Sequence, residues 1–70
     1  MLKTIKEIQV GQKWYAAGDP SCIVTIVDIV CWDEENPDDL ISYDIYHQFD
    51  NGIINDKDGF NFQVRYAKYD

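Results

Sequence analysis

The chain has 70 residues, of which 46% are hydrophobic and 14% aromatic, and 13 acidic residues outnumber 6 lysines and arginines to give a formal net charge of −7. This length suits one domain near the lower limit of independent folding, and the apolar content is too high for a disordered polyanion. An acidic protein repels phosphates, so we expect no direct binding of nucleic acid. Because no segment resembles a targeting sequence or a membrane span, we expect a single domain over residues 1–70 in the cytoplasm.

The N-terminal segment predicts one short helical turn and a strand. Residues 4–7 fit a capping box, in which a threonine and a glutamate three residues later satisfy the first backbone donors of a helix, although a strand could equally begin at Ile8. Residues 12–17 predict a strand centred on Trp14. Glycine and proline at residues 18–21 then indicate a turn.

The strongest strand prediction covers residues 22–32, CIVTIVDIVCW, which are rich in β-branched side chains. Both sides are largely apolar, as expected where a sheet rolls round on itself. Alternation gives one side Ile23, Thr25, Val27, Ile29 and Cys31, and the other Val24, Ile26, Asp28, Val30 and Trp32. Cys22 and Cys31 would lie on opposite sides of an unbroken strand, too far apart for a disulfide, and reduced thiols fit a reducing compartment.

An acidic loop at residues 33–39, DEENPDD, separates this strand from another at residues 40–49. Pro37 cannot continue a central strand. The two strands are expected to form a β-hairpin at the centre of the domain, with Ile41, Tyr43, Ile45, His47 and Phe49 on one side of the second strand. A tight turn centred on Asn51 and Gly52 should lead into a partner strand at Ile53.

The C-terminal segment is ambiguous between strand and helix. Residues 55–59 predict another turn, and residues 60–69 alternate as a final strand would. A short helix from Asp58 is the alternative, because the spacing of Phe62, Tyr66 and Tyr69 also suits a helix. The fold prediction is mostly β: a single small antiparallel barrel or rolled sheet of about five strands, with at most one short helical turn near the N-terminus.

This layout is similar to that of SH3-like small β-barrels, including short ones among phage and prophage proteins. The resemblance rests on VGQKWY at residues 10–15, CIVTIVDI at 22–29, the strand containing Tyr43, DNGII at 50–54 and the closing segment 62–66. It implies a fold and no activity. The ALYDY-like segment and the Trp-Trp pair of eukaryotic SH3 ligand sites are absent, so the resemblance supplies no peptide-binding residues.

Motifs for catalysis and metal binding are weak. The DKDG sequence at residues 56–59 does not fit an EF-hand, because Ile54 and Arg65 would occupy its first and twelfth positions. His47 and two separated cysteines make no zinc site, and we interpret His47 as a structural residue, with a Cys–His nucleophilic pair as the alternative. Carboxylates on a surface loop lack the enclosing pocket that acid–base catalysis needs. We therefore predict no enzymatic activity, no metal and no cofactor.

The negative charge is concentrated in the middle of the chain. The 38 residues from Asp19 to Asp56 carry ten acidic residues and no lysine or arginine. Such a region attracts cationic partners and repels polyanions, and exposed aromatic side chains beside it would anchor a protein interface. The residues predicted to contact a basic partner are Asp28, Trp32, Asp33, Glu34, Glu35, Asp38, Asp39, Asp44 and Tyr46.

Three interpretations of this charge remain open. The first is an inhibitor that docks on a Lys/Arg-rich nucleic-acid-binding surface, with carboxylates in place of phosphates. Phage counter-defence proteins such as anti-CRISPRs are similar in size and charge, and they act in the cytoplasm of a bacterial host. The second is an SH3-like accessory module that binds a basic or proline-rich peptide of a larger assembly. The simplest is a surface that only keeps a small domain soluble.

Overall fold

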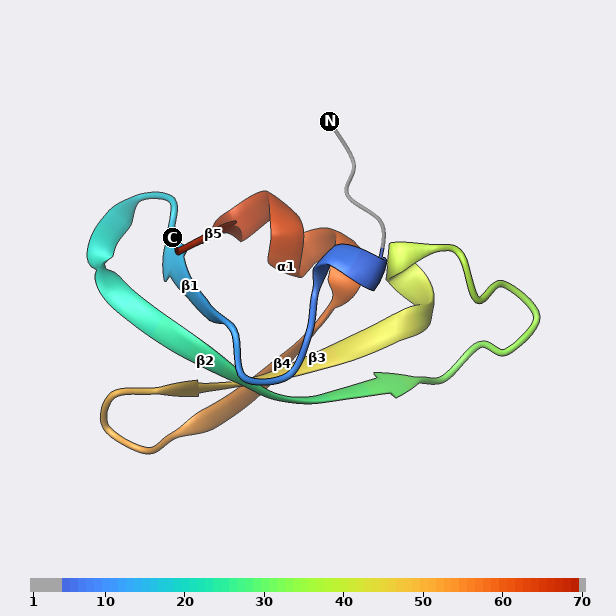
Figure 1. Ribbon diagram of the computed structural model, residues 1–70, viewed down its shortest axis with the longest axis horizontal. Helices are drawn as coiled ribbons and strands as arrows, with labels where there is room; N and C mark the ends of the chain where they lie inside the picture. Colours follow the sequence, from blue (N-terminus) through green and yellow to red (C-terminus); the bar gives the residue numbers. More distant parts are fainter. Residues whose placement is uncertain (1–4, 70) are drawn as a thin grey trace.

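A computed structural model describes residues 5–69 and shows one twisted, rolled antiparallel sheet with a short helix against one side (Figure 1). The strand order is β4-β3-β2-β1-β5, and every neighbouring pair is antiparallel. The prediction of a mostly β, rolled antiparallel sheet of about five strands is therefore confirmed. In chain order the elements are η1 (Ile5–Glu7), β1 (Lys13–Ala16), β2 (Asp19–Cys31), η2 (Leu40–Ser42), β3 (Tyr43–Phe49), β4 (Ile54–Asp58), α1 (Gly59–Arg65) and β5 (Tyr66–Lys68).

The β2–β3 hairpin is present as predicted, but a β-bulge divides β2 into two parts. Consecutive residues of β3 pair with Ile26 and Asp28, so Val27 is an extra residue in β2. A bulge of this kind shifts the alternation of side chains by one position. The core side of β2 therefore carries Val24 and Ile26 before the bulge and Ile29 after it. The prediction that Ile29 lies on the opposite side from Val24 and Ile26 was wrong, because it assumed an unbroken strand.

The bulge also changes the relation between the cysteines. Counted along the strand, Cys22 shares a side with Ile26, and Cys31 shares a side with Ile29, so both thiols lie on the core side. The prediction of opposite sides was wrong for the same reason. Both cysteines are half-buried and free, and no disulfide joins them.

Two segment boundaries differ from the predictions. The strand β2 begins at Asp19, so the predicted turn at residues 18–21 is largely strand, and the chain reverses at residues 17–18. Pro20 is tolerated because it lies at the start of the strand. The predicted strand over 40–49 begins with the single turn η2, and its residue Ile41 is exposed instead of lying with the core side of β3.

The β3–β4 turn is present but is centred one residue earlier than predicted. The Gly52 N–H donates to the Phe49 carbonyl oxygen at 2.9 Å, which places Asp50 and Asn51 at the centre of the turn. Gly52 follows with a φ of 90°, the left-handed conformation that glycine adopts without steric cost. The Asn-Gly signal therefore identified the hairpin, while the glycine takes the position after the central pair.

The C-terminal segment is the largest departure from the predictions. Residues 55–58, predicted as a turn, belong to β4. The predicted strand over 60–69 was wrong for residues 60–65, where the helical alternative applies, and right for 66–68, which form β5. The expected N-terminal turn is η1, but α1 exceeds the prediction of at most one helical turn. The capping residue predicted for that turn, Thr4, lies outside the described residues.

Asp58 explains why the chain turns from strand to helix at this point. It has an extended backbone, and its Oδ2 accepts the Asn61 N–H at 3.0 Å, as an N-cap residue does. Its Oδ1 also accepts the Asn61 side-chain amide at 2.6 Å. A residue read as part of a turn thus ends β4 and begins α1.

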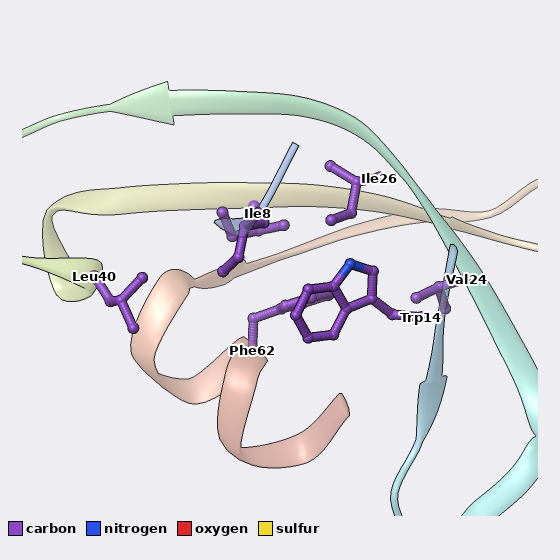
Figure 2. Close-up of a cluster of buried hydrophobic side chains, with 7 residues drawn as sticks. Ile8, Trp14, Val24, Ile26, Leu40 and Phe62 are labelled. Carbon is purple, nitrogen blue, oxygen red and sulfur yellow. The ribbon is translucent and has the colours of Figure 1, made fainter. Parts of the chain in front are cut away.

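The core lies between the sheet and α1, as Figure 2 shows. Its fully or nearly buried apolar side chains are Ile8, Trp14, Val24, Ile26, Leu40, Ile45 and Phe62. Trp14 from β1 meets Phe62 from α1 edge to face, with ring centroids 5.2 Å apart. The indole Nε1 donates to the Gln12 side-chain oxygen at 3.1 Å, so the polar atom of this large side chain is satisfied.

His47 lies in the same core, within an aromatic cluster. Its ring centroid is 5.6, 5.1 and 5.4 Å from those of Phe49, Phe62 and Tyr66. Nδ1 lies 3.0 Å from the Ile45 carbonyl oxygen and must donate to it, whereas Nε2 is buried without a hydrogen-bond partner. Burial lowers the pKa of His47 from its usual 6.5, so the folded protein holds a neutral imidazole.

Replacing Gly59 with alanine should destabilise the fold. A Cβ at this position would lie 2.5 Å from the Leu40 carbonyl oxygen, so α1 and η2 would have to separate. We expect Gly59→Ala to lower the free energy of unfolding by about 1–3 kcal/mol in urea denaturation. Gly18→Ala is the matched control, because no atom lies within 4 Å of its Cβ position. Equal stability of the two variants would contradict this packing.

Acidification should destabilise the protein through His47. The unfolded chain takes up the proton near pH 6.5 and the folded protein only at lower pH, so stability is full above 6.5 and falls as the pH decreases. Urea denaturation between pH 7.5 and 5 measures this slope, which His47→Phe should reduce. Both proteins contain the same carboxylates, so their contribution to the pH dependence cancels in the comparison. One of them is Asp58: partial burial acts to raise its pKa, but hydrogen bonds from Asn61 hold this pKa below its usual 3.8. Parallel profiles for the two proteins would show that His47 is not responsible.

Candidate functional site

The predicted partner-binding residues on the strands lie on the side of the sheet opposite the core. Ile45 and His47 are buried, so Tyr46 between them points to the outer side of β3. Tyr46 pairs with Asp28 of β2 and with Asp56 of β4. Paired residues on neighbouring strands share a side and lie about 4.8 Å apart, so Tyr46 is flanked by two carboxylates.

A second row runs parallel to the first. Asp44 of β3 pairs with Val30 of β2 and with Asp58 of β4. Val30 is exposed and Asp44 is half-buried, so an apolar side chain adjoins the carboxylates on this side of the sheet. Within residues 5–69 the helical elements supply Ile5, Leu40 and Phe62 to the opposite, core side.

The acidic loop at the end of the hairpin is folded by its own side chains. The Asp33 carboxylate accepts the Glu35 N–H at 3.2 Å and the Asn36 side-chain amide at 3.0 Å. The Tyr43 hydroxyl donates to the Pro37 carbonyl oxygen at 2.7 Å, which ties the loop to β3. Burial, with Cys31 nearby, raises the pKa of Tyr43, so this donor stays protonated. Asp33 therefore has a structural role, whereas Glu34, Glu35, Asp38 and Asp39 are simply exposed.

Two apolar side chains flank the base of this loop. Trp32 precedes the loop, and its side chain is 60% exposed. Its backbone N–H donates to the Ser42 carbonyl oxygen at 2.9 Å. Ile41 follows the loop and is 55% exposed. Large apolar groups beside carboxylates resemble the anchor and polar rim of a protein interface. Trp32 was predicted in this role, while Ile41 was assigned to the buried side of a strand.

Asp56 is the other residue that the sequence pattern failed to place. It was assigned to a turn, but it lies in β4 and completes the row with Tyr46 and Asp28. Residues 54–58, INDKD, have no alternation of apolar and polar side chains that could have indicated a strand. We call the following residues the acidic face: Asp28, Trp32, Asp33, Glu34, Glu35, Asp38, Asp39, Asp44, Tyr46 and Asp56.

The structure also bears on the two other kinds of site that the sequence raised, a metal site and a Cys–His pair. Residues 5–69 contain no group of three or more His, Cys, Asp or Glu side chains that could hold a metal ion. Neither ring nitrogen of His47 bonds to a cysteine, because Nδ1 is used by Ile45 and Nε2 has no partner. Over the same residues, no helix is long and apolar enough to cross a membrane.

Comparisons with known proteins add no assignment to this geometry. No protein-family model matches the chain, and searches of curated proteins and of solved structures find no match. Function is therefore inferred from the acidic face, its exposure and its charge.

Proposed function

We propose that this protein is a non-enzymatic, SH3-like binding protein whose acidic face docks on a Lys/Arg-rich surface of a nucleic-acid-binding partner. The observation that carries the proposal is the row in which Tyr46 lies between Asp28 and Asp56 on the side of the sheet opposite the core. An arginine of the partner can stack on the aromatic ring while a carboxylate accepts its N–H groups. A tyrosine between two acids therefore suits a guanidinium group, whereas a surface that only keeps the protein soluble does not require this arrangement.

Charge favours a partner that normally binds phosphates. The exposed loop acids follow the row that contains Asp44 in the direction of the strands, where β2 and β3 are connected, so the acidic face extends from the sheet onto the loop. Lysines and arginines that bind a nucleic-acid backbone would find carboxylates here instead, and the two ligands would compete for them. Inhibition of such a partner in the bacterial cytoplasm, as by phage counter-defence proteins of the anti-CRISPR type, is the role that we propose.

Removing charge from the central row should weaken binding without loss of stability. We expect the Asp28→Asn, Asp56→Asn double variant to bind the partner at least tenfold more weakly, since each lost charge pair contributes about 1 kcal/mol or more. Asparagine at 28 keeps an oxygen that can accept the Ile29 N–H, as Asp28 does at 2.9 Å. The unfolding midpoint should hold or rise because self-repulsion decreases.

The measurement is capture of partners from a bacterial lysate on the immobilised protein, followed by elution with duplex or single-stranded DNA. Asp50→Asn is the matched control, because Asp50 is an exposed acid in the β3–β4 turn, away from the acidic face. The proposal requires that DNA elutes the partner and that only the double variant loses it. If DNA does not elute the captured partner, the accessory-module alternative is favoured. If the double variant captures the partner as wild type does, the acidic residues only keep the protein soluble.

A further inference from the structure

Among the described residues, β4 is an edge strand with one unpaired side. It hydrogen-bonds only to β3, at the end of the strand order. The β3–β4 hairpin projects away from α1 in Figure 1, at the lower left of the view. The opposite edge, β5, has only three residues, whereas β4 has five. The sheet therefore offers β4 as its longer free edge.

The hairpin geometry shows which backbone groups point outward. The Phe49 N–H donates to the Ile53 carbonyl oxygen at 2.9 Å, which makes this a hydrogen-bonded position. Hydrogen-bonded positions alternate along an antiparallel pair, so Asn55 and Lys57 are the next residues of β4 that bond to β3. The N–H and C=O groups of Ile54 and Asp56 consequently face the free side.

The side chains beside this edge select for a particular kind of strand. Ile53 and Ile54 are 56% and 53% exposed, and Asp56 is exposed on the acidic face. A neighbouring strand would place one residue opposite Ile54 and another opposite Asp56, on the same side of the sheet. An apolar residue opposite Ile54 and a basic residue opposite Asp56 match these side chains, and the two would lie two positions apart in the added strand.

A second copy of this chain fits the edge poorly. Antiparallel pairing of β4 with β4 about Asp56 would place this carboxylate opposite its own copy, and like charges directly opposite destabilise a strand pair. Pairing about Asn55 would place Asp56 opposite Ile54 of the copy, so neither register gives the carboxylate a cation. The segment has no proline or bulge that would block strand addition in general. The charge thus discriminates against self-association while the backbone remains available.

We propose that β4 accepts an extended segment of the partner, with an apolar and a basic residue two positions apart, as a sixth strand. The inference rests on the proposed function and adds its binding mode. Main-chain hydrogen bonds to Ile54 and Asp56 would provide affinity, and the cation opposite Asp56 would provide specificity. The acidic face continues from this edge to Tyr46, so further basic residues of the partner reach it.

The first test uses two synthetic ten-residue peptides with the repeat Val-Thr-Arg-Thr, in which valine and arginine alternate along one side of an extended strand. One peptide is unmodified, and the other is N-methylated at its valine and arginine amides. The unmodified peptide should slow amide hydrogen exchange at Ile54 and Asp56, as measured by NMR, and leave Asn55 and Lys57 unchanged because their N–H groups already bond to β3. Loss of two neutral hydrogen bonds should weaken binding of the methylated peptide about tenfold or more. Equal affinity of the two peptides, or no binding at millimolar concentration, overturns strand addition.

The second test removes the edge donor from the protein while keeping its charge. Ile54→Pro deletes an N–H that β3 does not use, at the first residue of the strand, where proline is tolerated. Ile54→Ala is the control, because it also removes the isoleucine side chain but keeps the backbone N–H. Peptide binding should fall several-fold further in the proline variant than in the alanine variant. The same loss in both variants overturns the main-chain contact, and the peptide pair still decides the question if the proline variant does not fold.

Failure of this inference is distinguishable from failure of the proposed function. If both peptides bind equally and Asp28→Asn with Asp56→Asn weakens both, the acidic face binds cations without strand addition. If neither charge removal nor DNA affects partner capture, the proposed function itself fails. Protection of Ile54 and Asp56 without peptide, rising with protein concentration, would instead assign the edge to a second copy of the chain and overturn the inference.

Discussion

The extra residue in β2 decides which side chains the sheet buries and which it exposes. Without the bulge at Val27, the alternation that buries Val24 and Ile26 would direct Asp28 into the core and Ile29 to solvent. Burying an unpaired carboxylate costs several kcal/mol, or forces the group to be neutral. The bulge therefore makes an apolar core and an outer row of carboxylates compatible on one long strand.

The two sides of the sheet consequently have opposite electrostatic demands. On the core side, His47 is held neutral among aromatic rings, and its Nε2 has no partner to stabilise a positive charge. On the outer side, Asp28 and Asp56 are exposed to water. β3 carries both environments within two residues, since Tyr46 and His47 point to opposite sides. The strand that fixes the core thereby also fixes the spacing of the acidic face.

Local signals in the sequence predicted the hairpin, the Asn-Gly turn and most of the acidic face, because each depends on neighbouring residues. The bulge at Val27 could not be predicted, since a strand with apolar residues on both sides has no pattern that reveals a shift of one position. The predictions for residues 55–65 were wrong for a related reason. Asp56 and Asp58 have the composition of a turn, and only pairing with β3 and capping of α1 separate their roles.

A charged residue on an edge strand ordinarily prevents aggregation, and Asp56 can perform that role against copies of its own chain. The same carboxylate would attract the cationic strand that we propose, so one charge would serve both protection from self-association and selection of that partner. Lys57 does not cancel this effect, because it pairs with Ile45 and so lies on the other side of β4. Because the adjacent residues Asp56 and Lys57 point to opposite sides, the outer side of the edge carries only negative charge. A surface that only keeps a protein soluble typically mixes charges of both signs.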